Sequence, residues 1–320
     1  MRGTVLSEVA PIMTQLARDG NISGELQPTC TRRRARRILP PYYVALAGFL
    51  LLTVVDQRLH FAQSSIEAPY PALTVGNIIS HLFMFHNLSS AWVVSVNRSF
   101  WSLALEWQLY LVFPLLVWGF RRWGVTRTAV AVLALTLSYR TWAYAVQDVP
   151  QFAFPLLAYA LPGRLFEFVL GMMAAVQLAG MREAPSRAWM RRYLAGAVAF
   201  GLLALAVTHW WSEYAPVADV PWGLAFFCLV MYGGGRSAVG GGWLQWRPLT
   251  SLGLISYSVY LIHEPLIQHA YAFLQTRHLS PPTTVLLLEV VVGPLLIGLG
   301  WLFFRLVESR FTHSSSIRPV

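Results

Sequence analysis

Long apolar stretches, separated by short polar segments rich in arginine, alternate along most of the chain. Eight of these stretches can cross a bilayer as helices, because about 20 mainly apolar residues span its hydrocarbon core. They cover residues 41–57, 100–120, 127–146, 156–180, 193–211, 220–235, 252–274 and 284–306. A further segment from Asn77 to Trp92 is more polar and is interpreted as a short re-entrant or interfacial piece. The pattern predicts an all-α fold, a polytopic transmembrane helix bundle with about eight spans.

Composition supports a membrane protein and argues against a soluble one. The chain is 56% hydrophobic and 12% charged, with 13 tryptophans, whereas charged residues make up about 25% of a usual soluble domain. The net charge of +10 could suggest a nucleic-acid partner. However, the basic residues are all arginines in short clusters between apolar stretches, which is typical of topology signals. We therefore expect the lipid bilayer, and no nucleic acid, as a partner.

The distribution of arginines predicts an orientation. If the run Arg32 to Arg37 is cytoplasmic, the alternation of spans places most other loop arginines on that side and only Arg58, Arg98 and Arg277 on the other. This predicts a multi-pass protein of the inner membrane with both termini in the cytoplasm. The expected organisation is a cytoplasmic N-terminal segment over residues 1–31, a transmembrane domain over residues 32–311 and a short cytoplasmic tail over residues 312–320.

Glu106 lies inside the second predicted span, where an ionisable side chain costs at least about 2.5 kcal/mol. Ser102, Glu106 and Tyr110 follow one another at intervals of four, so they form one polar stripe on an apolar helix. Such a costly stripe indicates a functional site in the outer half of the membrane. The structural alternative is an ion pair between Glu106 and an arginine of another helix, such as Arg140 or Arg164.

Arg164 and Glu167, spaced i,i+3 near the outer end of their span, are expected at a depth similar to that of Glu106. They are expected to take part directly in catalysis, or they satisfy each other along one helix face. His263, near the middle of the seventh span, has an unperturbed pKa of about 6.5 that suits a catalytic base. A hydrogen-bonded core role for His263 is the alternative.

Other polar residues also have two interpretations. His81 and His86 could line the entrance for an acceptor, or they could pack at the interface with Trp92. Arg305 and Glu308, again spaced i,i+3, are expected to form a structural pair. Neither Cys30 nor Cys228 has a metal-ligand spacing, so no metal site is predicted.

Five ordered motifs resemble those of the membrane acyltransferase 3 family, whose members O-acylate bacterial surface glycans and related acceptors. They read RRRARRILPPYY, SFWSLALEWQLYLVFPLL, GRLFEFVLGM, ISYSVYLIHEPL and FFRLVESRF. The resemblance implies transfer of an acyl group, expected to be acetyl, from acyl-CoA to a hydroxyl of a glycan. It implies that Arg34 and Arg37 meet the CoA phosphates, that Glu106 is the motif carboxylate and that Arg164 and Glu167 form the family's R-x-x-E pair.

The chain departs from the family at its beginning. Family members start with two further helices, the first of which carries a histidine regarded as catalytic, whereas residues 11–23 here resemble the linker that follows those helices. The chain is therefore expected to lack these two helices. Three alternatives to an active enzyme stay open: an inactive remnant, a non-catalytic membrane subunit or a small-solute transporter.

Overall fold

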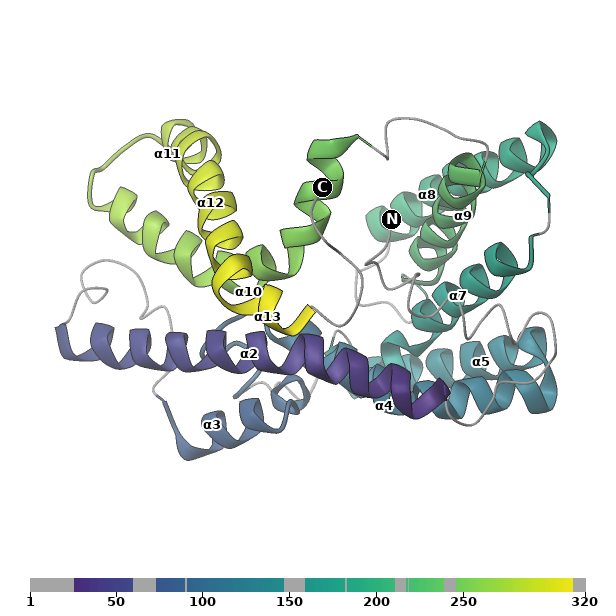
Figure 1. The fold of residues 1–320 in the computed structure, drawn as a ribbon, viewed down its shortest axis with the longest axis horizontal. Helices are drawn as coiled ribbons and strands as arrows, with labels where there is room; N and C mark the ends of the chain where they lie inside the picture. The colour runs from purple at the N-terminus through teal and green to yellow at the C-terminus, as the bar shows by residue number, and fades with distance from the viewer. Residues whose placement is uncertain are drawn as a thin grey trace. The chain divides into compact units, whose positions relative to one another are not determined.

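The computed structural model describes residues 26–59, 73–89, 91–146, 159–181, 183–210, 217, 219–238 and 246–312 (Figure 1). Helix is the only regular secondary structure in these ranges, which confirms the all-α prediction. The expected N-terminal segment lies outside the described residues up to residue 25, and so does the expected tail after Thr312.

Each of the eight predicted spans corresponds to a helix over its described residues. They correspond to α2 (Leu26–Leu59), α4 (Trp101–Trp123), α5 (Val125–Ala145), α7 (Leu161–Gly180), α8 (Arg187–Trp210), α9 (Asp219–Ala238), α10 (Arg247–Gln275) and a last, segmented helix. The last helix consists of α11 (Pro281–Leu287), η3 (Leu288–Val292), α12 (Gly293–Phe303), η4 (Phe304–Glu308) and α13 (Ser309–Thr312). In the described part of the polar segment before α4, the structure has the short helices α3 (Val75–Leu82) and η1 (His86–Leu88).

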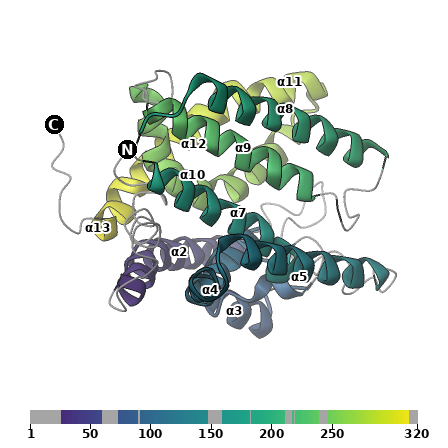
Figure 2. The same cartoon turned by 90° about the vertical axis from the view of Figure 1, so that its right-hand side faces the viewer.

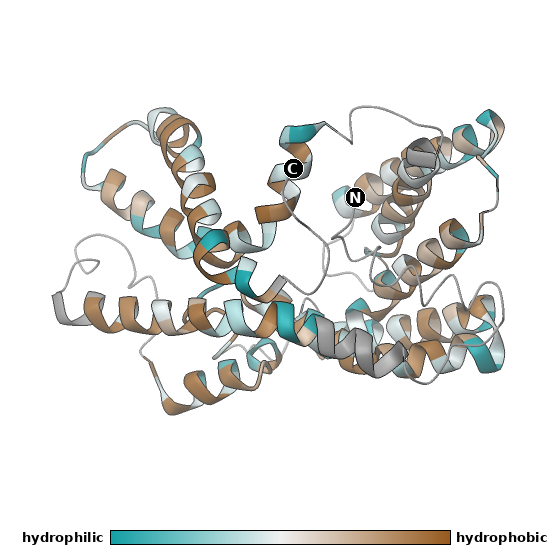
Figure 3. Cartoon of the chain, in the orientation of Figure 1, coloured by the Kyte–Doolittle hydropathy of each residue, from teal (hydrophilic) through white to brown (hydrophobic). Residues whose placement is uncertain are grey.

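Five of the described helices are long and apolar enough to cross a membrane: Arg34–Val55, Trp101–Trp123, Leu161–Gly180, Arg187–Trp210 and Pro281–Phe311. The count of eight spans stays a prediction, because α5, α9 and α10 fall outside this set. Apolar residues run along the helices (Figure 3), and only 11% of the most apolar stretch of α8 is buried. Exposed apolar surface of this kind fits a lipid environment.

The chain divides into two compact units. The first contains α4 from Leu105 onward, α5, α7, α8 and α9. Within it α7 packs against both α5 and α9, and α8 packs against α9 (Figures 1 and 2). Gly124 joins α4 to α5 with a φ of 85°, a left-handed conformation that glycine adopts without strain.

Glycines also set the spacing of α7 and α9 in this unit. A Cβ on Gly223 would lie 3.2 Å from Cγ of Glu167, and a Cβ on Gly234 would lie 2.6 Å from Cδ1 of Leu178. The two contacts share the same sequence offset, so α7 and α9 run parallel and close together. This arrangement brings the polar beginnings of both helices to the same end.

The second unit contains most of α2, α3, the first residues of α4, α10 and the last helix. The Tyr42 hydroxyl donates to the carbonyl of His81 at 2.9 Å, which attaches α2 to α3. Gly300 of α12 lies directly against Val259 of α10, so the last helix packs closely on α10. The η3 and η4 turns of this last helix are π-helical, and such turns occur frequently at functional sites.

Candidate active site

Glu106 lies half-exposed on α4, and its carboxylate accepts a hydrogen bond from the hydroxyl of Tyr110, one turn further along. Tyr110 is buried, with 5% of its surface exposed, so the packing of its ring holds the hydroxyl against the Glu106 carboxylate. Among the described residues, Glu106 forms no ion pair with an arginine, and both Arg140 and Arg164 contact Asp219 instead. The structural alternative, an ion pair of Glu106 with Arg140 or Arg164, therefore does not form among the described residues.

Asp219 binds two arginines at the start of α9. Its carboxylate lies 2.5 Å from Nη1 of Arg140 on α5 and 3.0 Å from Nη1 of Arg164 on α7. The predicted pair of Arg164 and Glu167 also forms, but at 3.8 Å it is the longer contact of Arg164. Asp219 was missed by the sequence reasoning, although it is the acidic residue in the first turn of α9, where the helix dipole favours a negative charge.

A cavity of about 300 Å³ opens beside this ionic cluster. Arg164, Glu167 and Asp219 line one end of it. Its remaining walls include Leu170, Gly171 and Ala174 of α7 and Trp222, Phe226 and Val230 of α9. Oε2 of Glu167 is shielded from solvent and accepts no hydrogen bond among the described residues. The cavity therefore joins a polar end to an apolar groove.

His263 belongs to a hydrogen-bonded cluster in the second unit. Its Nδ1 lies 2.7 Å from the carbonyl oxygen of Tyr260, which can only accept, so Nδ1 carries the hydrogen and Nε2 is the basic nitrogen. The Tyr260 hydroxyl donates to the carbonyl of Ser99 at 2.5 Å and lies 2.5 Å from Oγ of Ser102. His263 thus has the hydrogen bond expected of a core residue, and a catalytic role for its Nε2 stays a prediction.

The segment before α4 is held by Asn97. Its side chain donates to the carbonyl of Leu261 at 3.1 Å and accepts from the backbone and hydroxyl of Ser99 at 2.9 and 2.7 Å. Val96 beside it has a φ of 61°, a rare conformation for a β-branched residue. Such strain persists where surrounding contacts enforce it and is concentrated at functional sites. Glu264 accepts from the Arg98 amide at 3.2 Å, which anchors α10 to the same segment.

His81 and His86 stack on each other, with ring centroids 3.9 Å apart and planes 2° from parallel. Both side chains are 0% exposed, so the expectation that they line an acceptor entrance is wrong for the described structure. Trp92 packs on Phe85, with ring centroids 5.7 Å apart. Burial lowers the pKa of His81 to about 4 and, together with the neighbouring His81, that of His86 to about 3. The pair is therefore neutral at physiological pH.

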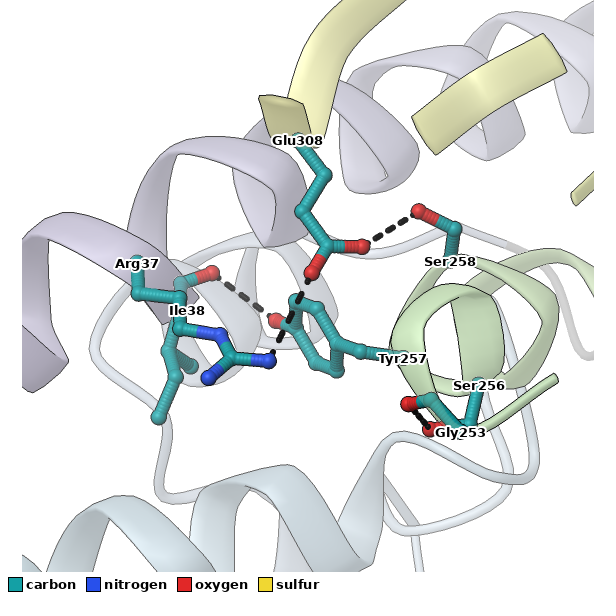
Figure 4. A network of polar contacts seen from close by, with 7 residues as sticks. All are labelled: Arg37, Ile38, Gly253, Ser256, Tyr257, Ser258 and Glu308. Carbon is teal, nitrogen blue, oxygen red and sulfur yellow. Dashed lines mark hydrogen bonds and ion pairs between the residues drawn. The ribbon is translucent and has the colours of Figure 1, made fainter. Parts of the chain in front are cut away.

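Arg34 and Arg37, the two arginines expected to meet CoA phosphates, differ in accessibility. Arg34 is buried, with 5% exposed, whereas 27% of the Arg37 side chain is exposed. Figure 4 shows Arg37 beside Glu308, with Nη2 and Oε1 3.8 Å apart. Ser258 donates to the other oxygen of Glu308 at 2.5 Å. Arg37 is therefore the more accessible of the two, and the binding of CoA phosphates by Arg34 and Arg37 stays a prediction.

The expected pair between Arg305 and Glu308 does not form. Glu308 is 0% exposed and contacts Arg37 and Ser258, while the guanidinium of Arg305 lies over the ring of Trp301 at 4.9 Å. Both residues belong to the π-helical turn η4, whose wider turn alters the helical phase on which an i,i+3 pair depends.

The sequence-predicted site residues thus fall into separate sets. Arg164 and Glu167 meet Asp219 in the first unit, Glu106 lies with Tyr110 on α4, and His263 lies with Tyr260 in the second unit. Within the described residues, no group of three or more histidine, cysteine, aspartate or glutamate side chains could hold a metal ion.

Curated relatives provide one comparison. The chain is 28% identical over 260 residues to the putative peptidoglycan O-acetyltransferase YrhL of Bacillus subtilis (strain 168), which covers 73% of this chain and 38% of YrhL. It is 26% identical over 250 residues to the peptidoglycan O-acetyltransferase OatA of Listeria monocytogenes, covering 73% of this chain and 39% of OatA. The chain therefore spans about two fifths of the length of these relatives. No solved structure matches it.

Comparison with protein families gives a broader match. The profile of a family described as an acyltransferase domain matches residues 27–305, a range that contains the first four motifs noted in the sequence and the beginning of the fifth. The match extends from the beginning of α2 into the π-helical turn η4. The chain therefore belongs to the acyltransferase 3 family.

Proposed function

We propose that the chain is an integral membrane O-acyltransferase that moves an acetyl group from acetyl-CoA to a hydroxyl of a cell-surface glycan. The family match and the names of the two relatives support acyl transfer to a glycan. Acetyl-CoA as the donor, the inner membrane as the location and cytoplasmic termini are part of the proposal. The arginine distribution along the sequence supports this orientation.

The observation that carries the proposal is the state of Glu106. Its carboxylate is kept on an apolar helix at a cost, is partly exposed, and is oriented by the Tyr110 hydroxyl instead of being neutralised by an arginine among the described residues. A carboxylate in this state can accept a proton from an incoming hydroxyl. A purely structural carboxylate in an apolar helix would be expected to have a cationic partner.

In the proposed reaction the acceptor hydroxyl loses its proton to a base while its oxygen attacks the thioester carbonyl of acetyl-CoA. The carbon–sulfur bond then breaks, and the CoA thiolate leaves and takes up a proton. Glu106 is the proposed base, and Nε2 of His263 is a second basic atom of the chain. Arg164 and Glu167 are proposed to bind the acceptor, and Arg34 and Arg37 to hold the phosphates of CoA.

The substitution Glu106→Gln tests this assignment, because it keeps the shape of the side chain and removes its basicity. We expect the rate of transfer from radiolabelled acetyl-CoA to peptidoglycan fragments to fall by roughly 100-fold or more, the usual contribution of a general base. Membrane expression and the thermal unfolding midpoint should stay near those of the unaltered chain.

Glu289→Gln is the matched control, since Glu289 is also a carboxylate in an apolar helix but lies in none of the five motifs. This variant should keep its transfer activity. Loss of folded protein with Glu106→Gln alone would favour a structural role for Glu106. Absence of transfer by the folded, unaltered chain would contradict the proposed enzyme and favour a non-catalytic membrane protein.

A further inference from the structure

The cavity beside Asp219 is elongated, with charged residues at one end and apolar residues along the rest of its length. Its walls follow α7 from Arg164 to Ala174 and α9 from Asp219 to Val230. Because α7 and α9 run parallel and a helix rises 1.5 Å per residue, the groove is about 15 Å long. This length suits an extended chain better than a single sugar ring.

Among the described residues, the charges at the polar end are balanced. Arg140 and Arg164 face the carboxylates of Asp219 and Glu167, so two positive groups are matched by two negative ones. A ligand head with a net charge would leave one of these groups uncompensated. In contrast, the Glu167 side chain lines the cavity and is 28% exposed, so its carboxylate can accept a hydrogen bond from a ligand hydroxyl. An uncharged head that carries a hydroxyl donor is complementary to this end.

The other end of the groove is apolar and open on one side. Phe226 and Val230 are exposed by 60% and 41%, and they line the groove on a helix of the predicted bundle. Gly171 lies opposite on α7, and a Cβ there would meet nothing within 4 Å. The missing side chain of Gly171 therefore leaves room for a ligand.

We propose that this groove between α7 and α9 binds the aliphatic chain of an amphiphilic acceptor, whose uncharged, hydroxyl-bearing head lies at Glu167. The inference deepens the proposed function and rests on it, because it assigns the acceptor to the class of lipid-linked hydroxyl compounds. Each methylene that the groove removes from water contributes up to roughly a fourfold gain in affinity.

Alkyl β-glucosides provide the kinetic test, because they carry the same sugar on chains from methyl to decyl. The chain in lipid nanodiscs is assayed for acetyl transfer from acetyl-CoA to each glucoside. We expect kcat/KM to rise with chain length. Partition of the longer glucosides into the bilayer also raises kcat/KM, so a variant of the groove is needed to isolate its contribution.

Gly171→Leu is that variant, since the space around its Cβ lets a larger side chain fill the groove without a clash. Gly201→Leu on α8 is the matched control, because a Cβ there also meets nothing within 4 Å and Gly201 does not line the groove. We expect Gly171→Leu to lower the decyl-to-methyl ratio of kcat/KM about tenfold or more, because the added side chain occupies the space of the alkyl chain. Gly201→Leu should keep the original ratio.

Two outcomes would overturn the inference. An unchanged ratio in Gly171→Leu would show that the chain does not occupy the groove. An equal loss for methyl and decyl glucosides would show that the site holds the sugar alone or that the variant is damaged, and thermal unfolding of the variant distinguishes these two causes.

A binding experiment separates this inference from the proposed function. A decyl glucoside with a photoreactive diazirine at the chain end is crosslinked to the chain in nanodiscs, and the labelled peptides are identified by mass spectrometry. Labelling near Gly171 and Val230 that is lost in Gly171→Leu and kept in Gly201→Leu would support the groove even if no transfer occurred. Transfer to methyl glucoside without such labelling would retain the enzyme and reject the lipid-linked acceptor.

Discussion

The two units hold their polar residues in different ways. In the first unit, Arg140, Arg164 and Asp219 form a compact ionic cluster of full charges, with contacts of 2.5 and 3.0 Å. In the second, His81 and His86 are buried as neutral rings, and the ion pair of Arg37 with Glu308 is long, at 3.8 Å. An apolar environment therefore accepts polar residues either as matched charges or in their uncharged form. Matched charges are sensitive to the loss of one partner, and uncharged groups are sensitive to pH.

The ionic cluster should respond most strongly to loss of one partner. Asp219→Asn would leave Arg140, which is 2% exposed, without its closest carboxylate. Removing one member of a buried ion pair typically costs about 3–5 kcal/mol, so we expect a loss of this size in unfolding free energy. Chemical denaturation in detergent measures it. Glu183→Gln, an exposed carboxylate outside the cluster, should change stability little, and equal effects of the two substitutions would refute the importance of the cluster.

The histidine pair should make the free energy of unfolding depend on pH. The folded pKa values of about 4 and 3 lie below the unfolded value of 6.5, so the unfolded chain takes up protons first as the pH falls. Stability contributed by the neutral pair is therefore fully present above about pH 6.5 and is lost progressively below it, by up to about 1.4 kcal/mol per pH unit for each histidine. Between about pH 7.5 and 5.5 we expect a loss of roughly 2–3 kcal/mol in unfolding free energy.

The double substitution of His81 and His86 by phenylalanine isolates this effect, because the stacked rings can be replaced by rings that do not titrate. Denaturation curves at several pH values compare the variant with the unaltered chain. The variant should lose less stability on acidification. A pH dependence that is the same in both would show that other groups cause it.

The smallest expected effect is at the long ion pair. Arg37→Ala should raise the KM for acetyl-CoA about tenfold, equivalent to about 1.4 kcal/mol, because one phosphate contact is lost. The loss of stability should be smaller than that of Asp219→Asn, because the 3.8 Å contact is long and the buried Glu308 keeps its hydrogen bond from Ser258. Arg36→Ala is the control within the same arginine run, because Arg36 is exposed and is not one of the two arginines proposed to hold the CoA phosphates. Equal KM changes in both variants would indicate a general charge effect.

Helix content and family could be predicted from the sequence because both depend on local patterns. Each predicted span needs only its own apolar residues to form a helix, and the five motifs are contiguous in sequence. The i,i+3 pair of Arg164 and Glu167 was also predictable, since one helix face fixes it. In contrast, the prediction of a pair between Arg305 and Glu308 was wrong, because a π-helical turn changes the spacing that the prediction assumes.

The sequence by itself determined that the chain is helical, that it belongs in a membrane and that Glu106 lies on an apolar helix with Tyr110 one turn away. Only the tertiary structure decided which partners the buried groups have. Asp219 meets Arg140 and Arg164 because three helices bring them together, and Glu308 meets Arg37 across more than two hundred residues of chain. The physical reason is that helix formation is governed by near neighbours in sequence, whereas charge compensation in an apolar interior depends on distance in space.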